Sequence, residues 1–206
     1  MFEKRDYVKG LFVRRRIMVH MDTKWLIINI AKTLFQQKGY KSVGLNEILK
    51  ECKITKGALY HHFPNGKEEL LITCLRSMNE EITTNMEDIF KKSPNTQKAT
   101  EATIDKLVVD FEREGTITGY TFTSIVREMA SLSEPVNKAS SLLFENILRV
   151  CCDKLIEEGF SKKSAHSNSV LITAAIEGGI MLCLAQKSSE PLKIVSAALP
   201  NLIKEL

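Results

Sequence analysis

Apolar residues return at intervals of three and four along almost the whole chain after residue 22, and glycine, proline or serine interrupts most of the runs. In the first run Leu26, Ile30 and Leu34 share one helical face, and Gly39 follows its end. Strand-like alternation nowhere occurs in a set large enough for a sheet. The sequence therefore predicts an all-α fold of about nine helices, at residues 23–38, 45–52, 56–62, 67–90, 97–114, 121–132, 135–158, 162–187 and 191–204.

Charge is distributed unevenly along the chain. Of the 29 basic and 25 acidic side chains, 15 and 7 fall within residues 1–76, which leaves 14 and 18 for the remainder. A basic segment on an acidic remainder is typical of nucleic-acid binding at one end, although a solvated charged surface has the same composition. We expect a basic extension at 1–21, a DNA-binding domain at 22–76, and a helical ligand-binding and dimerisation domain at 77–206.

The extension has neither a helical cap nor a sustained apolar period. Its arginines at 14–16 follow the apolar part instead of preceding it, which does not fit a signal peptide. Two interpretations stay open. The segment is either a basic arm that contacts DNA phosphates, or it is a flexible tail or a mispredicted start, with the true start at Met18 or Met21.

Residues 45–62 contain two short helices joined by a three-residue turn, the arrangement of a helix-turn-helix. Thr55 ends the turn and can cap the second helix, because its side-chain oxygen can accept a hydrogen bond from a free backbone N–H. Leu59 and Phe63 lie four residues apart and would anchor this helix. Its opposite side would then fit the major groove of DNA.

Several segments of this region resemble one protein family. Over about residues 23–75 the chain is similar to the DNA-binding domain of TetR-family repressors, on the motifs Gly39-Tyr40, Ile54-Thr55-Lys56-Gly57-Ala58-Leu59-Tyr60-His61-His62-Phe63 and Lys67-Glu68-Glu69-Leu70. The stretch HHFPNGKEEL and, less specifically, Glu177-Gly178-Gly179 resemble the LmrA/YxaF-like branch. The resemblance implies a repressor that binds a palindromic operator as a dimer, is released by a small apolar inducer, and controls an efflux or detoxification gene.

The resemblance also implies which residues contact DNA: Lys56, Gly57, Ala58, Tyr60, His61, Lys67 and Gly44. Gly44 stands where many members have a hydroxyl cap, so a phosphate there would be bound by backbone N–H groups. Ala58 replaces a common threonine or serine and offers a methyl group to a thymine methyl. As alternatives, Tyr60 would be partly core, and one of the histidines at 61 and 62 would make no specific contact.

The last two predicted helices are unusually apolar, with glycine and alanine in the middle of the helix at 162–187. Small residues allow close helix–helix approach, which suits a dimer seam, although part of this face belongs to the monomer core. A palindromic operator requires two recognition helices about 34 Å apart, or a multiple of that distance. We therefore expect double-stranded DNA as a partner and a homodimer formed through the last two helices.

An effector pocket is predicted among the middle helices, because aromatic and methionine side chains suit apolar ligands. The expected lining residues are Phe111, Tyr120, Phe122, Met129, Phe144, Leu148, Cys151 and Met181. Such residues at helical spacing are also ordinary core residues. Arg127, Glu128 and Glu177 interrupt otherwise apolar helices and would either orient a ligand or form structural ion pairs.

The sequence contains no H-x-x-x-H, G-x-S-x-G or phosphate-loop pattern, so we expect no catalytic residue, no cofactor and no metal. The longest apolar run, 176–185, is too short for a membrane span, and no membrane partner is expected. The five irregularly spaced cysteines favour buried thiols in a reducing cytoplasm. An activator or a redox-responsive regulator with the same DNA-binding motif stays open as an alternative.

Overall fold

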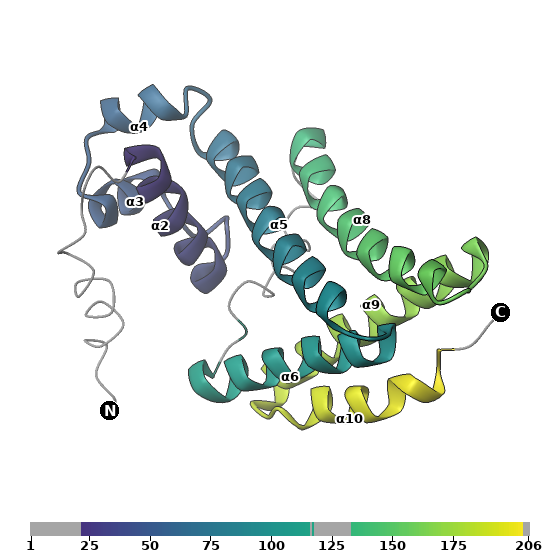
Figure 1. Ribbon diagram of the computed structural model, residues 1–206. Coiled ribbons are helices and arrows are strands. Elements are labelled where there is room, and N and C mark those ends of the chain that lie inside the picture. The colour runs from purple at the N-terminus through teal and green to yellow at the C-terminus, as the bar shows by residue number, and fades with distance from the viewer. Residues whose placement is uncertain (1–21, 116, 118–132, 204–206) are drawn as a thin grey trace.

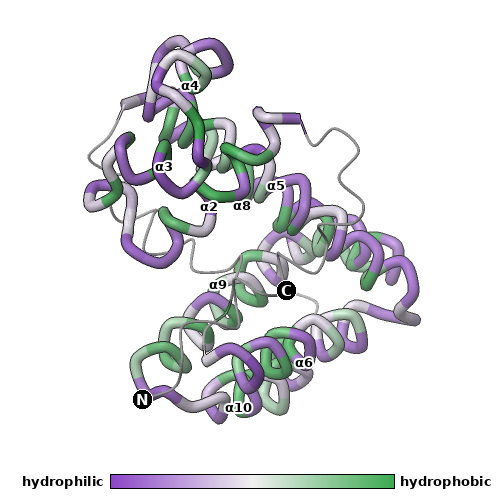
Figure 2. The backbone as a smooth tube through the Cα atoms, turned by 90° about the vertical axis from the view of Figure 1, so that its left-hand side faces the viewer, coloured by the Kyte–Doolittle hydropathy of each residue, from purple (hydrophilic) through white to green (hydrophobic). Residues whose placement is uncertain are grey.

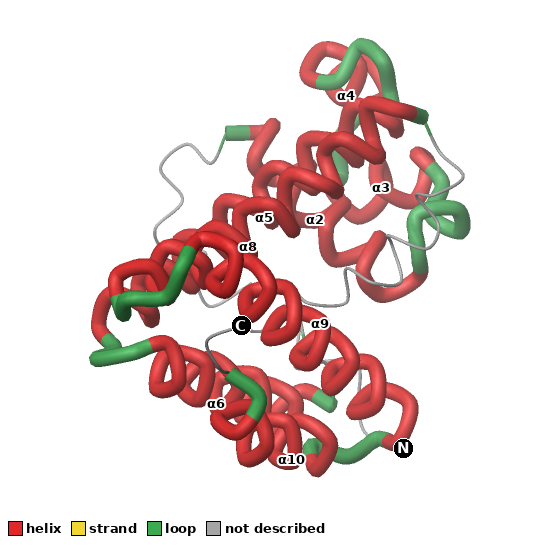
Figure 3. The backbone as a smooth tube through the Cα atoms, turned by 90° about the vertical axis from the view of Figure 1, so that its right-hand side faces the viewer, coloured by secondary structure: helices red, strands yellow, loops and turns green. Residues whose placement is uncertain are grey.

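The computed structural model describes residues 22–115, 117 and 133–203, and the regular elements among them are all helices (Figures 1 and 3). Eight are α-helices and one is a short 3-10 helix: α2 (Thr23–Lys38), α3 (Leu45–Cys52), α4 (Lys56–His62), α5 (Lys67–Lys92), α6 (Thr96–Glu114), α8 (Glu134–Glu157), α9 (Lys162–Gln186), α10 (Glu190–Ala198) and η2 (Leu199–Asn201). The predicted all-α fold is confirmed. The expected helix at 121–132 and the extension at 1–21 lie outside the described residues.

Polar caps and special residues set the helix ends. The side chains of Asp22, Asn95 and Ser161 accept hydrogen bonds from first-turn N–H groups of α2, α6 and α9. Gly115 ends α6 in a left-handed conformation with φ of 67°. Pro200 lacks an N–H and cannot continue an α-helix, which explains why α10 passes into η2 instead of forming the single longer helix predicted.

Helix α5 joins two lobes and, at 26 residues, is the longest helix described (Figure 1). It packs against α2 in the lobe that holds α3 and α4, and against α6 and α8 beyond. The view in Figure 2 shows α2–α4 at one end of the molecule and α6, α9 and α10 at the other. The domain division expected at residue 76 falls inside α5, so the two lobes share one continuous helix.

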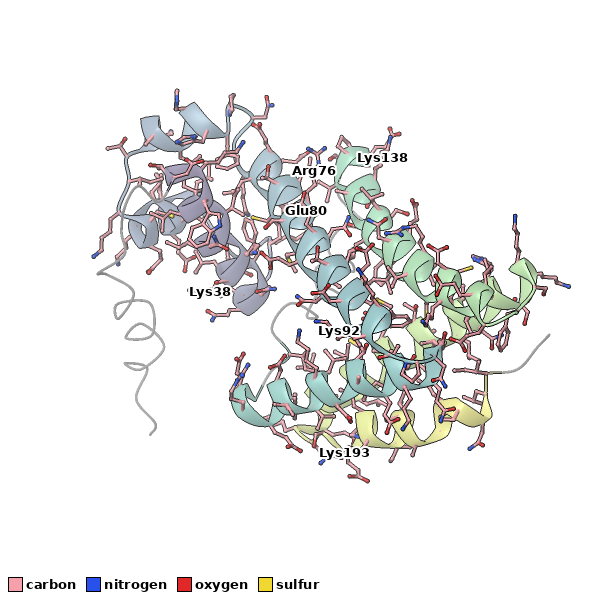
Figure 4. All side chains as sticks on the ribbon, in the orientation of Figure 1. Lys38, Arg76, Glu80, Lys92, Lys138 and Lys193 are labelled. Atoms are coloured by element: carbon pink, nitrogen blue, oxygen red, sulfur yellow. The ribbon has the colours of Figure 1, made fainter. Side chains whose placement is uncertain are left out.

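Polar contacts fix α5 to its neighbours on both sides. Lys32 of α2 is only 9% exposed, and its ammonium group contacts the Glu81 carboxylate and the Ser77 hydroxyl of α5. Three pairs connect α5 to α8 or to the residue before it: Glu68 with Ser133, Asn79 with Asn146, and Glu87 with Arg149. Figure 4 shows further charged side chains on these two helices, among them Arg76 and Lys138. A displacement of α5 must therefore rearrange contacts in both lobes.

Candidate nucleic-acid interface and internal cavity

The turn between α3 and α4 holds the second helix at a fixed angle. Lys53 adopts the left-handed conformation (φ 55°, ψ 42°), and its N–H bonds to the end of α3. Thr55 Oγ1 accepts a hydrogen bond from the N–H of Ala58 at 3.2 Å, which confirms the predicted cap. Leu59 and Phe63 are 0% and 1% exposed, which confirms the predicted anchors. One side of α4 is thereby fixed in the core.

The other side of α4 faces solvent and carries most of the side chains expected to contact DNA. Lys56, Gly57 and His61 are exposed, and Tyr60 is 38% exposed. The Lys56 ammonium nitrogen lies 5.7 Å from the centre of the Tyr60 ring. Ala58 is half-buried, and so is His62, whose ring centre lies 5.0 Å from that of His61. The outward surface of α4 is thus cationic, aromatic and able to donate hydrogen bonds.

Gly66, directly before α5, adopts a backbone conformation that would strain any residue with a side chain. It has φ of 72° and ψ of −139°, a conformation that only glycine adopts readily. A Cβ at this position would lie 3.6 Å from the Tyr60 ring. That distance is an ordinary van der Waals contact, so the backbone conformation, and not the space beside Tyr60, favours glycine here.

A surface hollow of about 240 Å³ separates the start of α3 from α4, and Gly44, Asn46, Lys56 and Tyr60 are among its lining residues. Gly44 caps α3 without a side-chain hydrogen bond, and nothing lies within 4 Å of the place its Cβ would occupy. The positive end of the α3 dipole and the Lys56 side chain favour an anion in this hollow. The geometry suits a backbone phosphate.

Lys67 occupies a different environment from the other predicted contacts. Its ammonium group donates a hydrogen bond to the backbone oxygen of Tyr40 at 2.6 Å and lies 4.0 Å from the centre of the Tyr40 ring. The Tyr40 ring in turn packs edge-on against Phe35. Burial, with a smaller contribution from the Glu68 charge, raises the pKa of Tyr40. In this structure Lys67 holds the start of α5 against the loop after α2, and a phosphate contact from it stays a prediction.

A small and partly open cavity, called the internal cavity below, lies where α5, α6, α8 and α9 meet, and it offers about 20 Å³ to the centre of a water molecule. Its lining residues are Met86, Phe90, Thr100, Thr103, Ile147, Ile172, Thr173, Ile176 and Glu177. Burial raises the pKa of the Glu177 carboxyl from 4.5 to about 7. An ionisable group in apolar surroundings is typical of functional sites.

Of the residues expected to line an effector pocket, the five that the structure describes do not border this cavity. Phe111 and Cys151 are buried elsewhere in the core, Phe144 and Leu148 are half-buried, and Met181 is 42% exposed. Tyr120, Phe122 and Met129 lie outside the described residues, as do Arg127 and Glu128. A contact between these residues and an effector stays a prediction.

The lining residues that sequence reasoning missed include two threonines of α6. Thr100 and Thr103 lie on the same buried face of α6 as Ile104. Hydroxyl groups on an otherwise apolar stripe were a usable signal. Glu177 on α9 was not missed: the sequence indicated that it would either orient a ligand or form an ion pair, and it does line the cavity. The sequence carries no comparable signal for Met86, Phe90 and Ile147, because they match ordinary core positions.

Helix α9 carries an apolar stripe on its outer surface. Its exposed residues are Val170, Leu171, Ala174, Gly178, Met181, Leu182 and Ala185. By length and composition α9 is apolar enough to cross a membrane. The uninterrupted apolar run at 176–185, taken alone, predicts that no segment is long enough for a span. One such helix is weak evidence for a span, and α9 packs against both α8 and α10.

The cysteines carry little thiolate at neutral pH. Burial raises the pKa of Cys52 to about 11 and those of Cys74 and Cys151 to about 12, and it also raises those of Cys152 and Cys183. The thiolate is the form that oxidants attack. In the described part of the chain no three His, Cys, Asp or Glu side chains are grouped to hold a metal ion.

Comparison with solved structures places the fold among known regulators. NemR of E. coli in its reduced form has a TM-score of 0.78 at 22% identity, covering 90% of this chain and 99% of that chain. A TetR transcriptional regulator from Legionella pneumophila has the same TM-score at 23% identity, covering 91% and 100%. Both likenesses concern the fold alone.

Sequence comparison shows the family. Residues 27–74 match the bacterial regulatory proteins of the tetR family, and residues 96–198 match the C-terminal domain of LmrA/YxaF-like transcriptional regulators. The HTH-type transcriptional regulator LmrA of Bacillus subtilis is 34% identical over 91% of this chain and 100% of its own length. YxaF of the same organism, an uncharacterized HTH-type transcriptional regulator, is 34% identical over 89% and 96%. The chain therefore belongs to the TetR family, with an LmrA/YxaF-like C-terminal domain, and is a helix-turn-helix transcriptional regulator and not an enzyme.

Proposed function

We propose that this regulator is a repressor that binds a palindromic operator as a homodimer and releases it when a small apolar molecule binds. The observation that carries the proposal is the outward surface of α4, where Lys56, Tyr60 and His61 are exposed while Leu59 and Phe63 are fixed in the core. The hollow beside it suits a DNA phosphate. The seven DNA contacts expected from the sequence are part of this proposal.

The homodimer forms through α9 with α10 beside it. The exposed apolar residues of α9 recur at helical spacing over about 15 residues, and Gly178 leaves an open notch in the stripe. Exposed apolar patches of this kind mark interaction sites, and a two-fold axis lets one stripe pack on its own copy. In such a seam the two copies of α9 would cover each other's apolar stripe. Length and composition alone would assign that stripe to the interior of a membrane.

Effector binding would reach the DNA-binding surface through α5. Lys67 at one end contacts the loop before α3, and Phe90 near the other end lines the internal cavity. A helix spans about 35 Å between these positions, at 1.5 Å per residue. A coupling of about 1–3 kcal/mol would weaken operator binding some 5- to 150-fold.

A DNA selection experiment tests the proposal. A randomised duplex library is incubated with the full chain, and the bound fraction is amplified and sequenced. We expect an inverted repeat whose half-sites lie one helical turn or a multiple of it apart. Labelled copies of the selected duplex then give affinities by fluorescence anisotropy.

His61→Ala and His166→Ala form a matched pair of variants for these measurements. Both imidazoles are exposed, but His166 lies on α9, away from the candidate interface. We expect His61→Ala to weaken operator binding about tenfold or more and His166→Ala to leave it unchanged. Recovery of no common motif, or equal affinities for the two variants, would contradict the assignment of α4 as the recognition helix.

The regulated gene and the cellular location are also part of the proposal. The resemblance to LmrA/YxaF-like regulators supports control of an efflux or detoxification gene, and the regulator would act in the cytoplasm, where its operator lies. An activator with the same motif is distinguished by transcription from the selected operator in vitro. The raised pKa values of the buried thiols count against redox control.

A further inference from the structure

Two polar atoms in the internal cavity have no hydrogen-bond partner. Thr100 Oγ1 and Glu177 Oε2 are the buried side-chain oxygens without a partner among the described residues, and both belong to the same cavity. Thr100 is only 2% exposed. By contrast, the hydroxyl of its neighbour Thr103 donates to the Ala99 carbonyl at 2.8 Å. Because buried polar atoms are nearly always hydrogen-bonded, the pair indicates an occupant that the protein itself does not provide.

The surroundings of this pair are rich in apolar groups and poor in donors. Met86 and Phe90 of α5 and Ile147 of α8 form much of the opposite wall. Among the described lining residues there is no lysine, arginine or histidine, so none of them supplies a counter-ion for Glu177. An incoming molecule would therefore need an apolar body and a donor of its own.

The small size of the cavity means that binding of an effector must enlarge it. Its volume of about 20 Å³ is enough for one ordered water molecule. A larger molecule can enter only if the helices around it move apart. The lining residues come from α5, α6, α8 and α9, and α5 also reaches the DNA-binding lobe.

We propose that this cavity is the effector site and that the effector is a compact apolar molecule bearing one hydrogen-bond donor, an amine or a hydroxyl, which donates to Glu177 beside Thr100. The inference rests on the proposed function for its regulatory meaning. An ammonium group would neutralise the Glu177 carboxylate, and a hydroxyl group would satisfy it by hydrogen bonding. A carboxylate-bearing effector is disfavoured where Glu177 is ionised, because it would place a second negative charge beside a carboxylate for which the described lining residues supply no counter-ion.

A matched ligand series tests the assignment. Benzyl, naphthyl and cyclohexyl bodies are each supplied as amine, alcohol, carboxylate and hydrocarbon. Thermal shift and calorimetry then measure their binding to the full chain and to the variants Glu177→Gln and Thr100→Val, with circular dichroism to establish that both variants are folded. Operator affinity is measured separately in the presence of each binder.

We expect the binders to be amines or alcohols. Glu177→Gln should weaken amines about tenfold or more while sparing alcohols, because the amide carbonyl still accepts a hydrogen bond but carries no charge. Thr100→Val should weaken both classes, and neither variant should affect hydrocarbons. Carboxylates as the best binders, unchanged binding by both variants, or no binding by any compound would overturn the assignment. A chain that binds amines or alcohols in this pattern but binds no DNA would contradict the proposed function alone.

Discussion

The ionisation of Glu177 should be visible in the stability of the protein. Burial raises the pKa of this carboxyl from 4.5 to about 7. Because the folded state has the higher pKa, its stability is greatest below the unfolded pKa and decreases as the pH rises through 7, and the loss is complete about one pH unit above the folded pKa. One pKa unit corresponds to about 1.4 kcal/mol. Ionised Glu177 should therefore cost the folded state about 3 kcal/mol at pH 8.5.

The variant Glu177→Gln removes this cost while keeping the shape of the side chain. Removing the ionisation of Glu177 should raise the free energy of unfolding of the variant above that of the parent. The expected difference is no more than about 1 kcal/mol at pH 5 and about 3 kcal/mol at pH 8.5. A change in hydrogen bonding adds the same amount to this difference at every pH. The increase of the difference between pH 5 and pH 8.5 therefore measures the ionisation of Glu177. Urea unfolding followed by circular dichroism measures it, at one protein concentration because dimerisation would contribute to stability.

Glu145→Gln is the matched control, because Glu145 is exposed on α8. For each variant, the free energy of unfolding is compared with that of the parent at both pH values. If the difference for Glu177→Gln increases with pH no more than the difference for Glu145→Gln, the reasoning is refuted. Glu177 would then be hydrated or paired in solution, and the cavity would not be the apolar, donor-poor space that the structure describes.

Three further predictions concern other contacts. Leu182 of α9 and Val109 of α6 are 50% and 58% exposed, and we expect Leu182→Glu to convert the dimer to monomer in sedimentation, at a cost of about 3 kcal/mol or more, while Val109→Glu leaves it intact. A Cβ at Gly179 would lie 2.9 Å from Leu192, whereas one at Gly178 meets nothing. In the Leu182→Glu background, thermal unfolding should therefore show Gly179→Ala to be about 1–3 kcal/mol less stable than Gly178→Ala, since both gain helix propensity equally. Gly66→Ala, at φ of 72°, should cost about 1–3 kcal/mol of stability in thermal unfolding, and unchanged stability in this variant would contradict the strain assigned to that turn.

The DNA-binding lobe was predictable because its determinants are local. The cap at Thr55, the anchors at Leu59 and Phe63 and the exposed residues between them all lie within one short segment, and helical spacing alone decides which side each one faces. What remained hidden depends on backbone conformation. Nothing in the sequence indicates that Lys53 is left-handed, because lysine has no preference for that region.

The cavity was not predictable for a different reason. Its lining comes from four helices and from positions between 86 and 177, so no single periodic pattern contains it. Sequence reasoning selected aromatic and sulfur-containing residues, but Phe111 and Cys151 pack into the core, and Met181 faces outward on α9. Which apolar residues border a void depends on how the helices cross, and that is set by packing of the whole bundle.

The placement of the cavity argues that sensing and DNA binding share one element. Met86 and Phe90 of α5 border it, while the same helix is held to α2 through Lys32 and to the turn before α3 through Lys67. Close-packed interiors do not deform continuously, so enlarging a space with room for one water molecule must shift a helix as a unit. Of the four helices that line the cavity, α5 is the one that also packs against α2 in the DNA-binding lobe. The differential affinity of an effector for the enlarged cavity would then set how far the operator-binding form is depopulated.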